Sequence, residues 1–289
     1  MWGGRPPPAA FDFGSGRFVE RLANQPQTGS TAKAAVEGAR PTRVSQRRSA
    51  KCQVLIYHSA VSPHSHRGRF ITFEGLDGCG KSTQLEKLAG VFRAQGLSVV
   101  VTREPGGTAT GEKIRRLLLD TATAGLSPMA ELALMFASRA QHITEVIQPA
   151  LAEGRVVLCD RFTDSTEAYQ GGGRKLGSEP VLALHRILCH GLQLDLTILM
   201  DSDVAASVER ARCRNKADTA KNGRGKHDEN RFEQESRAFF ARVRAAYLAI
   251  AAREPQRVAL VDARGTAAET HARIVEIVRR KMKLAAKTA

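Results

Sequence analysis

A glycine-rich segment that ends in lysine and serine carries the clearest chemistry of the sequence. Residues 75–82 read Gly-Leu-Asp-Gly-Cys-Gly-Lys-Ser, which fits the phosphate-binding pattern G-x-x-x-x-G-K-[ST]. Glycines let successive backbone N–H groups converge on a polyphosphate, and a helix that begins there adds its partial positive charge. Lys81 would contact the β- and γ-phosphates, and the Ser82 hydroxyl could ligate Mg²⁺. The segment predicts a site for ATP or GTP made of Gly75, Leu76, Asp77, Gly78, Cys79, Gly80, Lys81, Ser82 and Thr83.

Two charged residues follow another short apolar run, Val156–Cys159. Asp160 stands where many phosphotransferases carry a carboxylate that helps to hold Mg²⁺, directly or through water. Arg161 is placed to bind a monophosphate acceptor, because its planar guanidinium can donate two parallel hydrogen bonds to phosphate oxygens. The alternative is a structural ion pair between Arg161 and Asp160 or Glu104.

Phe136 and Arg139 are spaced i, i+3 and therefore share one face of a predicted helix. An aromatic ring beside a guanidinium suits a flat heterocycle, with stacking on the ring and a donor at its carbonyl edge. The alternative is a core phenylalanine beside a solvent-facing arginine, and helical spacing taken alone favours that alternative.

Three further segments make the acceptor more specific. They are Thr102–Thr108 (TREPGGT), Leu134–His142 (LMFASRAQH) and Asp160–Arg174 (DRF followed by STEAYQGGGR). Together with the phosphate loop, and in this order and spacing, they resemble the bacterial thymidylate kinase family over about residues 69–284. The resemblance implies a P-loop nucleotide kinase fold, a homodimer formed through helices around 128–152 and 179–190, and transfer of a phosphoryl group from MgATP to dTMP.

The resemblance also assigns roles to individual side chains. It implies that Phe136 stacks on thymine, that Arg139 bonds a thymine carbonyl, and that Thr166 meets the base. Tyr169 would pack against the sugar, and Asp77 would accept a hydrogen bond from the 3′-hydroxyl. The dTMP-binding set expected on this basis is Asp77, Arg103, Phe136, Arg139, Arg161, Thr166, Tyr169 and Gln170.

A basic segment over about residues 210–231 is the predicted mobile lid. It contains Arg210, Arg212, Arg214, Lys216, Lys221, Arg224, Lys226 and Arg231. Position 78 in the phosphate loop is glycine, so the sequence resembles the family members whose catalytic arginine comes from the lid. Arg212 and Arg214 are the preferred candidates, ahead of Arg224, and we group them with Lys81, Asp160 and Arg161 as catalytic residues. A solvated basic loop is the alternative.

Short apolar runs alternate with amphipathic stretches from Arg69 onward, which predicts an α/β fold with a five-stranded parallel sheet covered by helices on both faces. The expected strands are Phe70–Glu74, Ser98–Thr102, Arg155–Cys159, Asp195–Met200 and Arg257–Val261. The expected helices are Lys81–Gln95, Gly111–Leu119, Pro128–Glu153, Glu179–Cys189, Val204–Arg214, Phe232–Arg253 and Ala267–Lys283.

The formal net charge of the chain is +15, and its first part is especially basic. Residues 1–68 contain a proline run and no sustained periodicity, so we expect a disordered basic extension ahead of a kinase domain at 69–289. An organellar targeting peptide or a misassigned start codon would give the same pattern. No apolar run reaches the ~18 residues of a membrane-spanning helix, so we expect no membrane partner and a cytoplasmic location.

The sequence thus predicts an ATP:dTMP phosphotransferase that works with Mg²⁺ in dTTP biosynthesis. A kinase for another nucleoside or deoxynucleoside monophosphate is the nearest alternative. A nucleotide-dependent nucleic-acid-binding protein is a further one, because a basic protein attracts polyanions as well as nucleotides. We expect nucleic-acid binding, if any, to be weak and confined to the basic extension.

Overall fold

The computed structural model of the 289-residue chain describes residues 68–222 and 231–282, and the side chains of 214–222 lie outside that description. The predicted extension over 1–68 therefore falls outside the described residues except for Gly68. Within the described ranges, no helix has the length and apolar character that crossing a membrane would require.

Five parallel strands form the sheet, in the order β2-β3-β1-β4-β5. They are β1 (Arg69–Gly75), β2 (Val99–Arg103), β3 (Val156–Asp160), β4 (Leu196–Asp201) and β5 (Val258–Asp262). The first, third and fourth are buried almost throughout, as expected for central strands covered on both faces. The five predicted strands are confirmed, with each end shifted by one residue.

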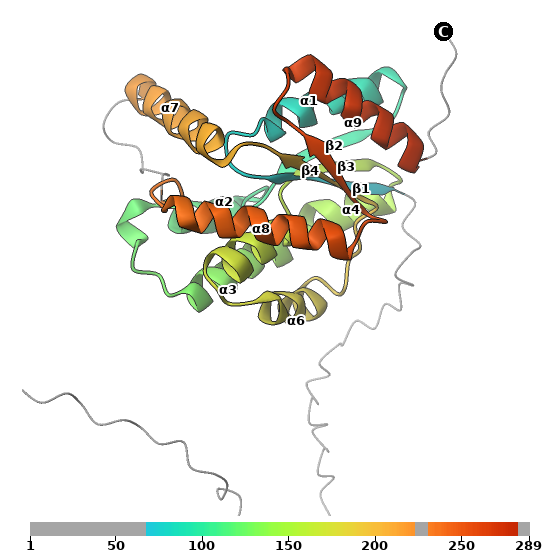
Figure 1. The fold of residues 1–289 in the computed structure, drawn as a ribbon. Coiled ribbons are helices and arrows are strands. Elements are labelled where there is room, and N and C mark those ends of the chain that lie inside the picture. Colours follow the sequence, from blue (N-terminus) through green and yellow to red (C-terminus); the bar gives the residue numbers. More distant parts are fainter. Residues whose placement is uncertain (1–67, 223–230, 283–289) are drawn as a thin grey trace, which may run out of the picture. The chain divides into compact units, whose positions relative to one another are not determined.

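Helices cover both faces of this sheet (Figure 1). On one side, α1 (Lys81–Ala94) and α9 (Ala267–Met282) pack on each other and enclose a core with Phe73, Leu88 and Ile274. On the other side lie α3 (Pro128–His142), α4 (Gln148–Ala152), α6 (Ser178–Leu188) and α8 (Arg237–Arg253). Ser127 caps the N-terminus of α3, since its hydroxyl accepts the Ala130 N–H.

The remaining elements are α2 (Ala109–Leu119), the 3₁₀ turn η1 (Thr121–Thr123), the π-helical turn η2 (Ile143–Ile147), α5 (Thr163–Thr166), the π-helical turn η3 (Glu167–Gly173) and α7 (Val204–Asn222). Four of them differ clearly from the prediction. The expected helix Pro128–Glu153 is interrupted by η2, the helical stretch 163–173 was not expected, and α7 runs eight residues past Arg214.

Strand order determines where the loops meet. Because β1 lies between β3 and β4, the loop that follows β1 is flanked by the ends of both neighbours, and Phe73 pairs with Asp160 in the β1–β3 register. In a parallel sheet these carboxyl ends form one edge, where ligands of such folds bind. The phosphate loop, Asp160 and Arg161 are all at this edge.

Candidate active site

The phosphate loop is the turn between β1 and α1, and it holds its lysine inward. The Lys81 side chain is 6% exposed, and Nζ donates to the carbonyl oxygens of Leu76 at 2.8 Å and Gly75 at 3.2 Å. Gly80, which precedes α1, has a φ of +96°, a backbone conformation that favours glycine. The loop therefore places an ammonium group and a helix N-terminus together, as the sequence predicted.

Helix α7 packs against the same loop at Gly78. A Cβ at this position, where φ is +77°, would lie 2.2 Å from the carbonyl oxygen of Ser207. The loop thus has no room for an arginine at position 78 while α7 is in place. Instead, Arg210 of α7 donates from Nε to the Gly78 carbonyl at 2.8 Å.

Ser82 and Asp160 meet across the edge of the sheet. The Ser82 hydroxyl donates to Oδ2 of Asp160 at 2.7 Å. Both side chains offer oxygen, the donor that Mg²⁺ prefers, and proteins usually bind this ion through one or two side chains while phosphates and water complete the shell. No cluster of three or more His, Cys, Asp or Glu side chains suited to a metal occurs in the described ranges. The pair fits a shared site of that kind.

Arg161 directly follows β3 in a left-handed conformation, with φ of 72°. Its Nη2 donates to Oδ1 of Asp77, in the phosphate loop, at 2.7 Å. Arg161 therefore forms an ion pair, but its partner is neither Asp160 nor Glu104, the two candidates considered from the sequence. Burial acts to lower the pKa of Arg161, but Asp77 and the other acidic groups beside it together raise the pKa well above its usual value. The guanidinium is therefore a fixed cation beside the phosphate loop.

Tyr169 completes this cluster from η3. Its hydroxyl donates to Oδ2 of Asp77 at 3.0 Å, and its ring centre lies 4.9 Å from the guanidinium carbon of Arg161. Partial burial would raise the pKa of Asp77, yet Arg161 and then Lys81 hold it well below its usual value. Asp77 thus forms one charged cluster with Arg161 and Tyr169, which lie far from it in sequence, and an ionised Asp77 can accept a hydrogen bond from a sugar hydroxyl.

A second cluster surrounds Arg139, which is only 2% exposed. Its guanidinium carbon lies 4.8 Å from the ring centre of Phe136, and Nη2 donates to the Thr166 hydroxyl at 2.8 Å. The Phe136 ring is fully buried. This agrees with one half of the alternative interpretation, a core phenylalanine, but not with the other half, because Arg139 does not face solvent. Nη1 of Arg139 is buried and has no hydrogen-bond partner within the described structure.

Two of the predicted dTMP-binding residues bond elsewhere in this structure. Arg103 is exposed and donates to both carboxylate oxygens of Glu112, at 3.1 and 3.0 Å. Gln170 is buried, and its Nε2 donates to Oε1 of Glu131 at 2.7 Å while its own Oε1 has no partner among the described groups. The structure therefore does not bring Arg103 or Gln170 into the Asp77–Arg161–Tyr169 cluster.

The lid residues are described only in part. Arg212 donates from Nε and Nη2 to the Glu233 carbonyl at 3.2 and 3.0 Å, which turns it toward the residues after the lid. The Arg214 side chain and Arg224 lie outside the described residues. Among the lid arginines whose contacts are described, Arg210 bonds the phosphate loop.

Comparison with known proteins identifies the family. The sequence profile described as thymidylate kinase matches residues 73–274. A thymidylate kinase of Pelobacter propionicus is 50% identical over 208 residues, which cover 72% of this chain and 92% of that protein. One of Pseudomonas syringae pv. tomato is 49% identical over 211 residues, covering 73% and 95%. The crystal structure of thymidylate kinase from Ehrlichia chaffeensis matches with a TM-score of 0.56 at 30% identity, covering 73% of this chain and 98% of that one. The chain belongs to the thymidylate kinase family.

This thymidylate kinase family member also has site-adjacent residues that the sequence analysis did not single out. Glu74, Ser165 and Tyr247 contact one another, and the last two also bond Arg161. Glu104, known from sequence only as a possible partner of Arg161, instead pairs with Arg139 and with His142. The one available signal for Glu74 was a carboxylate at the end of an otherwise apolar strand, FITFE.

Proposed function

We propose that the chain transfers the γ-phosphoryl group of ATP to dTMP and releases ADP and dTDP. The assignment of this reaction rests on membership of the thymidylate kinase family. The observation in this structure that supports the acceptor is the buried Nη1 of Arg139, which has no partner in the described part of the chain. A buried unpaired donor costs ~1–3 kcal/mol, and a carbonyl oxygen of thymine would satisfy it.

The chemistry needs little covalent help from the protein. An oxygen of the dTMP phosphate attacks the γ-phosphorus, a new P–O bond forms, and the bond from the γ-phosphorus to the bridging oxygen of ADP breaks. Because that acceptor oxygen already carries charge near neutral pH, positioning and charge neutralisation dominate the rate. Lys81 would neutralise the β- and γ-phosphates after exchanging its loop carbonyls for phosphate oxygens.

Arg161 is the proposed ligand of the acceptor phosphate. Its Nη2 contacts Asp77 and Tyr169, the two residues proposed to contact the sugar of dTMP. The phosphate attached to that sugar would therefore bind near the Arg161 guanidinium. Arg210 is the lid residue that we propose to face the transferred group, because it contacts Gly78. Ser82 and Asp160 are the residues that would hold Mg²⁺, whose chemistry is to neutralise phosphate charge when it is bound.

A homodimer is part of the proposal. Two helices that pack on each other, α3 and α6, leave large apolar side chains at the surface: Met129 is 51% exposed and Ile187 67%. A second copy would bury them. Sedimentation of the purified protein at several concentrations tests this point, and a monomer at all concentrations would contradict it. The cytoplasmic location stays a prediction.

A panel of acceptors tests the activity directly. Purified protein with MgATP should phosphorylate dTMP with a higher kcat/KM than dUMP, UMP or dGMP, and should leave thymidine unmodified. Preference for another monophosphate would replace dTMP by that nucleotide. ATP hydrolysis that depends on added nucleic acid, without any acceptor phosphorylation, would favour a nucleic-acid-binding protein instead.

A further inference from the structure

The carboxylate of Glu74 lies in an unusual place for a charged group. Glu74 is in β1, at the centre of the sheet, and its side chain is fully buried. Its neighbours earlier in the strand include Phe70, Ile71 and Phe73, all equally buried. Burying a carboxylate is expensive unless several donors compensate it. Neither the phosphate loop nor the proposed mechanism uses this group.

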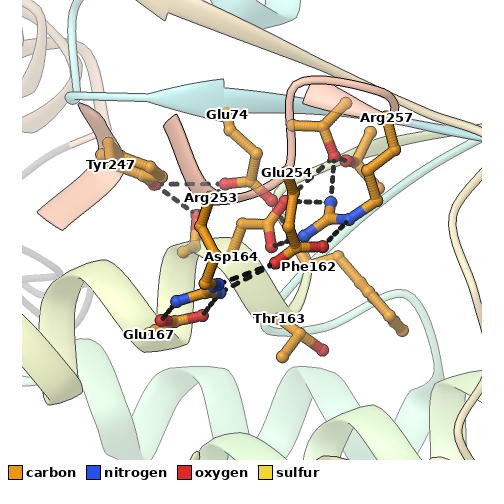
Figure 2. A network of polar contacts seen from close by, with 12 residues as sticks. Glu74, Phe162, Thr163, Asp164, Glu167, Tyr247, Arg253, Glu254 and Arg257 are labelled. Carbon is orange, nitrogen blue, oxygen red and sulfur yellow. Dashed lines mark hydrogen bonds and ion pairs between the residues drawn. The ribbon is translucent and has the colours of Figure 1, made fainter. Parts of the chain in front are cut away.

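Three neutral donors bind the Glu74 carboxylate. Oε1 accepts the backbone N–H of Phe162 at 2.7 Å, and Oε2 accepts the hydroxyl of Tyr247 at 3.1 Å and that of Ser165. Figure 2 shows Tyr247 reaching the carboxylate from α8, while Phe162 comes from the segment that follows β3. Glu74 therefore joins three separate parts of the chain around one point.

The same two hydroxyls anchor the Arg161 guanidinium. Nη1 of Arg161 donates to the Ser165 hydroxyl at 2.9 Å and to the Tyr247 hydroxyl at 3.1 Å. Phe162, whose amide Glu74 holds, is the next residue after the left-handed Arg161. One guanidinium nitrogen is thus held by the partners of Glu74, while Nη2 faces Asp77 and Tyr169.

Counting hydrogens shows what the carboxylate contributes. Each hydroxyl has one hydrogen. One points to Oε2 of Glu74, and the other points to Oε2 or to the neighbouring hydroxyl oxygen 2.7 Å away, so oxygen lone pairs stay free to accept the two N–H groups of Nη1. An amide at position 74 removes this solution. If its oxygen accepts the Phe162 N–H, its NH₂ donates to the hydroxyls, and one hydroxyl hydrogen is left facing the guanidinium. If the amide is reversed, its NH₂ faces the Phe162 N–H.

We propose that Glu74 is a positioning residue for Arg161, acting through Ser165, Tyr247 and the Phe162 amide to keep the guanidinium aligned for the acceptor phosphate. The inference rests on the proposed role of Arg161 in binding that phosphate. It assigns a function to a strand residue that touches neither substrate.

The surroundings of Glu74 disfavour its charged form, so ionisation of this carboxylate costs free energy. Burial, and after it the negative charge of Asp164, raise the pKa of Glu74 to about 7. Asp164 itself is held by both Nη atoms of Arg257, at 2.7 and 2.8 Å, as Figure 2 shows. Strongly shifted pKa values of this kind are common at functional sites.

The test compares a ligand that has the phosphate with one that lacks it. At pH 8, where Glu74 is ionised, Glu74→Gln should weaken dTMP binding about tenfold, the loss expected for one misaligned charge-assisted hydrogen bond. Its affinities for thymidine and ATP should stay within about twofold of those of the unmodified protein, all measured by calorimetry. The matched control is Glu167→Gln. Glu167 is another buried carboxylate, but it pairs with Arg253 and not with the partners of Arg161, so this change should leave all three affinities unchanged.

Two outcomes overturn the inference. Equal weakening of dTMP and thymidine would mean that Glu74 only supports the fold, and unchanged dTMP binding would mean that Arg161 needs no such support. Should the Gln variant fail to fold, Tyr247→Phe removes one hydroxyl and must give the same selective loss for dTMP. Arg161→Ala separates the two proposals: if it does not itself lower the preference for dTMP over thymidine, the phosphate role of Arg161 is what fails.

Discussion

Nε of Arg139 donates to Oε2 of Glu104 at 2.6 Å, and the two side chains are 2% and 3% exposed. The carboxylate also meets Nδ1 of His142 at 2.9 Å, and the guanidinium lies over two aromatic rings, those of Phe136 and Phe162. A buried ion pair of this kind adds little net stability as a pair, but removal of one partner leaves the other charge unpaired.

The first prediction follows from that asymmetry. Arg139→Met should lower the free energy of unfolding by ~3–5 kcal/mol, because the Glu104 carboxylate loses its cation inside the core. The double variant that adds Glu104→Gln should lose clearly less than the sum of the two single changes. Urea denaturation of the four proteins measures this coupling, and additive losses would show that the two side chains do not stabilise each other.

Sequence reasoning located the elements and motifs better than the contacts between them. The strands could be predicted because each is a short apolar run. The phosphate loop could be predicted because its residue types and the strand and helix that flank it nearly suffice to identify it. The pairing of Arg161 with Asp77 could not be predicted, because the two residues are 84 positions apart and only the strand order brings them together.

The helical stretch 163–173 was missed for a local reason. Its three final glycines resemble a loop, yet they are there for packing. A Cβ at Gly172 would lie 2.6 Å from the Ala246 Cβ, and one at Gly173 would lie 2.6 Å from the Phe239 ring, so helix α8 approaches this backbone too closely for any side chain. Similarly, Glu74 is the polar end of the predicted strand Phe70–Glu74, and only the fold shows that its side chain is buried.

The second prediction concerns the phosphate loop. Lys81→Met keeps the aliphatic stem and removes the cation, so the fold should persist while turnover of dTMP falls by at least ~10³-fold, as expected where charge neutralisation dominates the rate. Lys87→Met, on an exposed face of the same helix, is the control and should retain kcat within about twofold. Near-normal dTDP formation by the Lys81 variant would contradict the proposed site.

The third prediction separates the lid arginines. Arg210 bonds the phosphate loop and Arg212 bonds the Glu233 carbonyl, so Arg210→Ala should lower kcat by about tenfold or more with little change in either KM. An interaction made mainly in the transition state has this kinetic effect. Arg212→Ala should have a smaller effect on kcat. The reverse order in steady-state kinetics would restore Arg212, as first expected from sequence, as the catalytic candidate.

A fourth prediction concerns the proposed boundary near residue 68. Strand β1 begins at Arg69, and every residue of the proposed site lies within 74–257. A protein that starts at Ser65 should therefore keep kcat and both KM values within about twofold, since terminal segments usually add little to the stability of a core. Any nucleic-acid affinity of the full chain should disappear with the basic segment. Precipitation or lost activity of the shortened protein would place the boundary further upstream.

The last prediction uses the titration of Glu74. Its pKa is about 7 in the folded protein against an ordinary 4.5, so the native state binds its proton more tightly than the unfolded chain does. The stability that this group contributes is complete below pH 4.5 and is lost as the pH rises through 7. Glu74→Gln cannot titrate, so the free energy of unfolding of the unmodified protein, measured relative to that variant, should fall by ~2–3 kcal/mol between pH 5 and pH 8. Denaturant unfolding of both proteins across this range gives the difference. Titrating groups that do not interact with Glu74 are common to the two proteins and cancel, so a difference that is flat or rises with pH would mean that Glu74 is ionised throughout and that burial does not hold its proton.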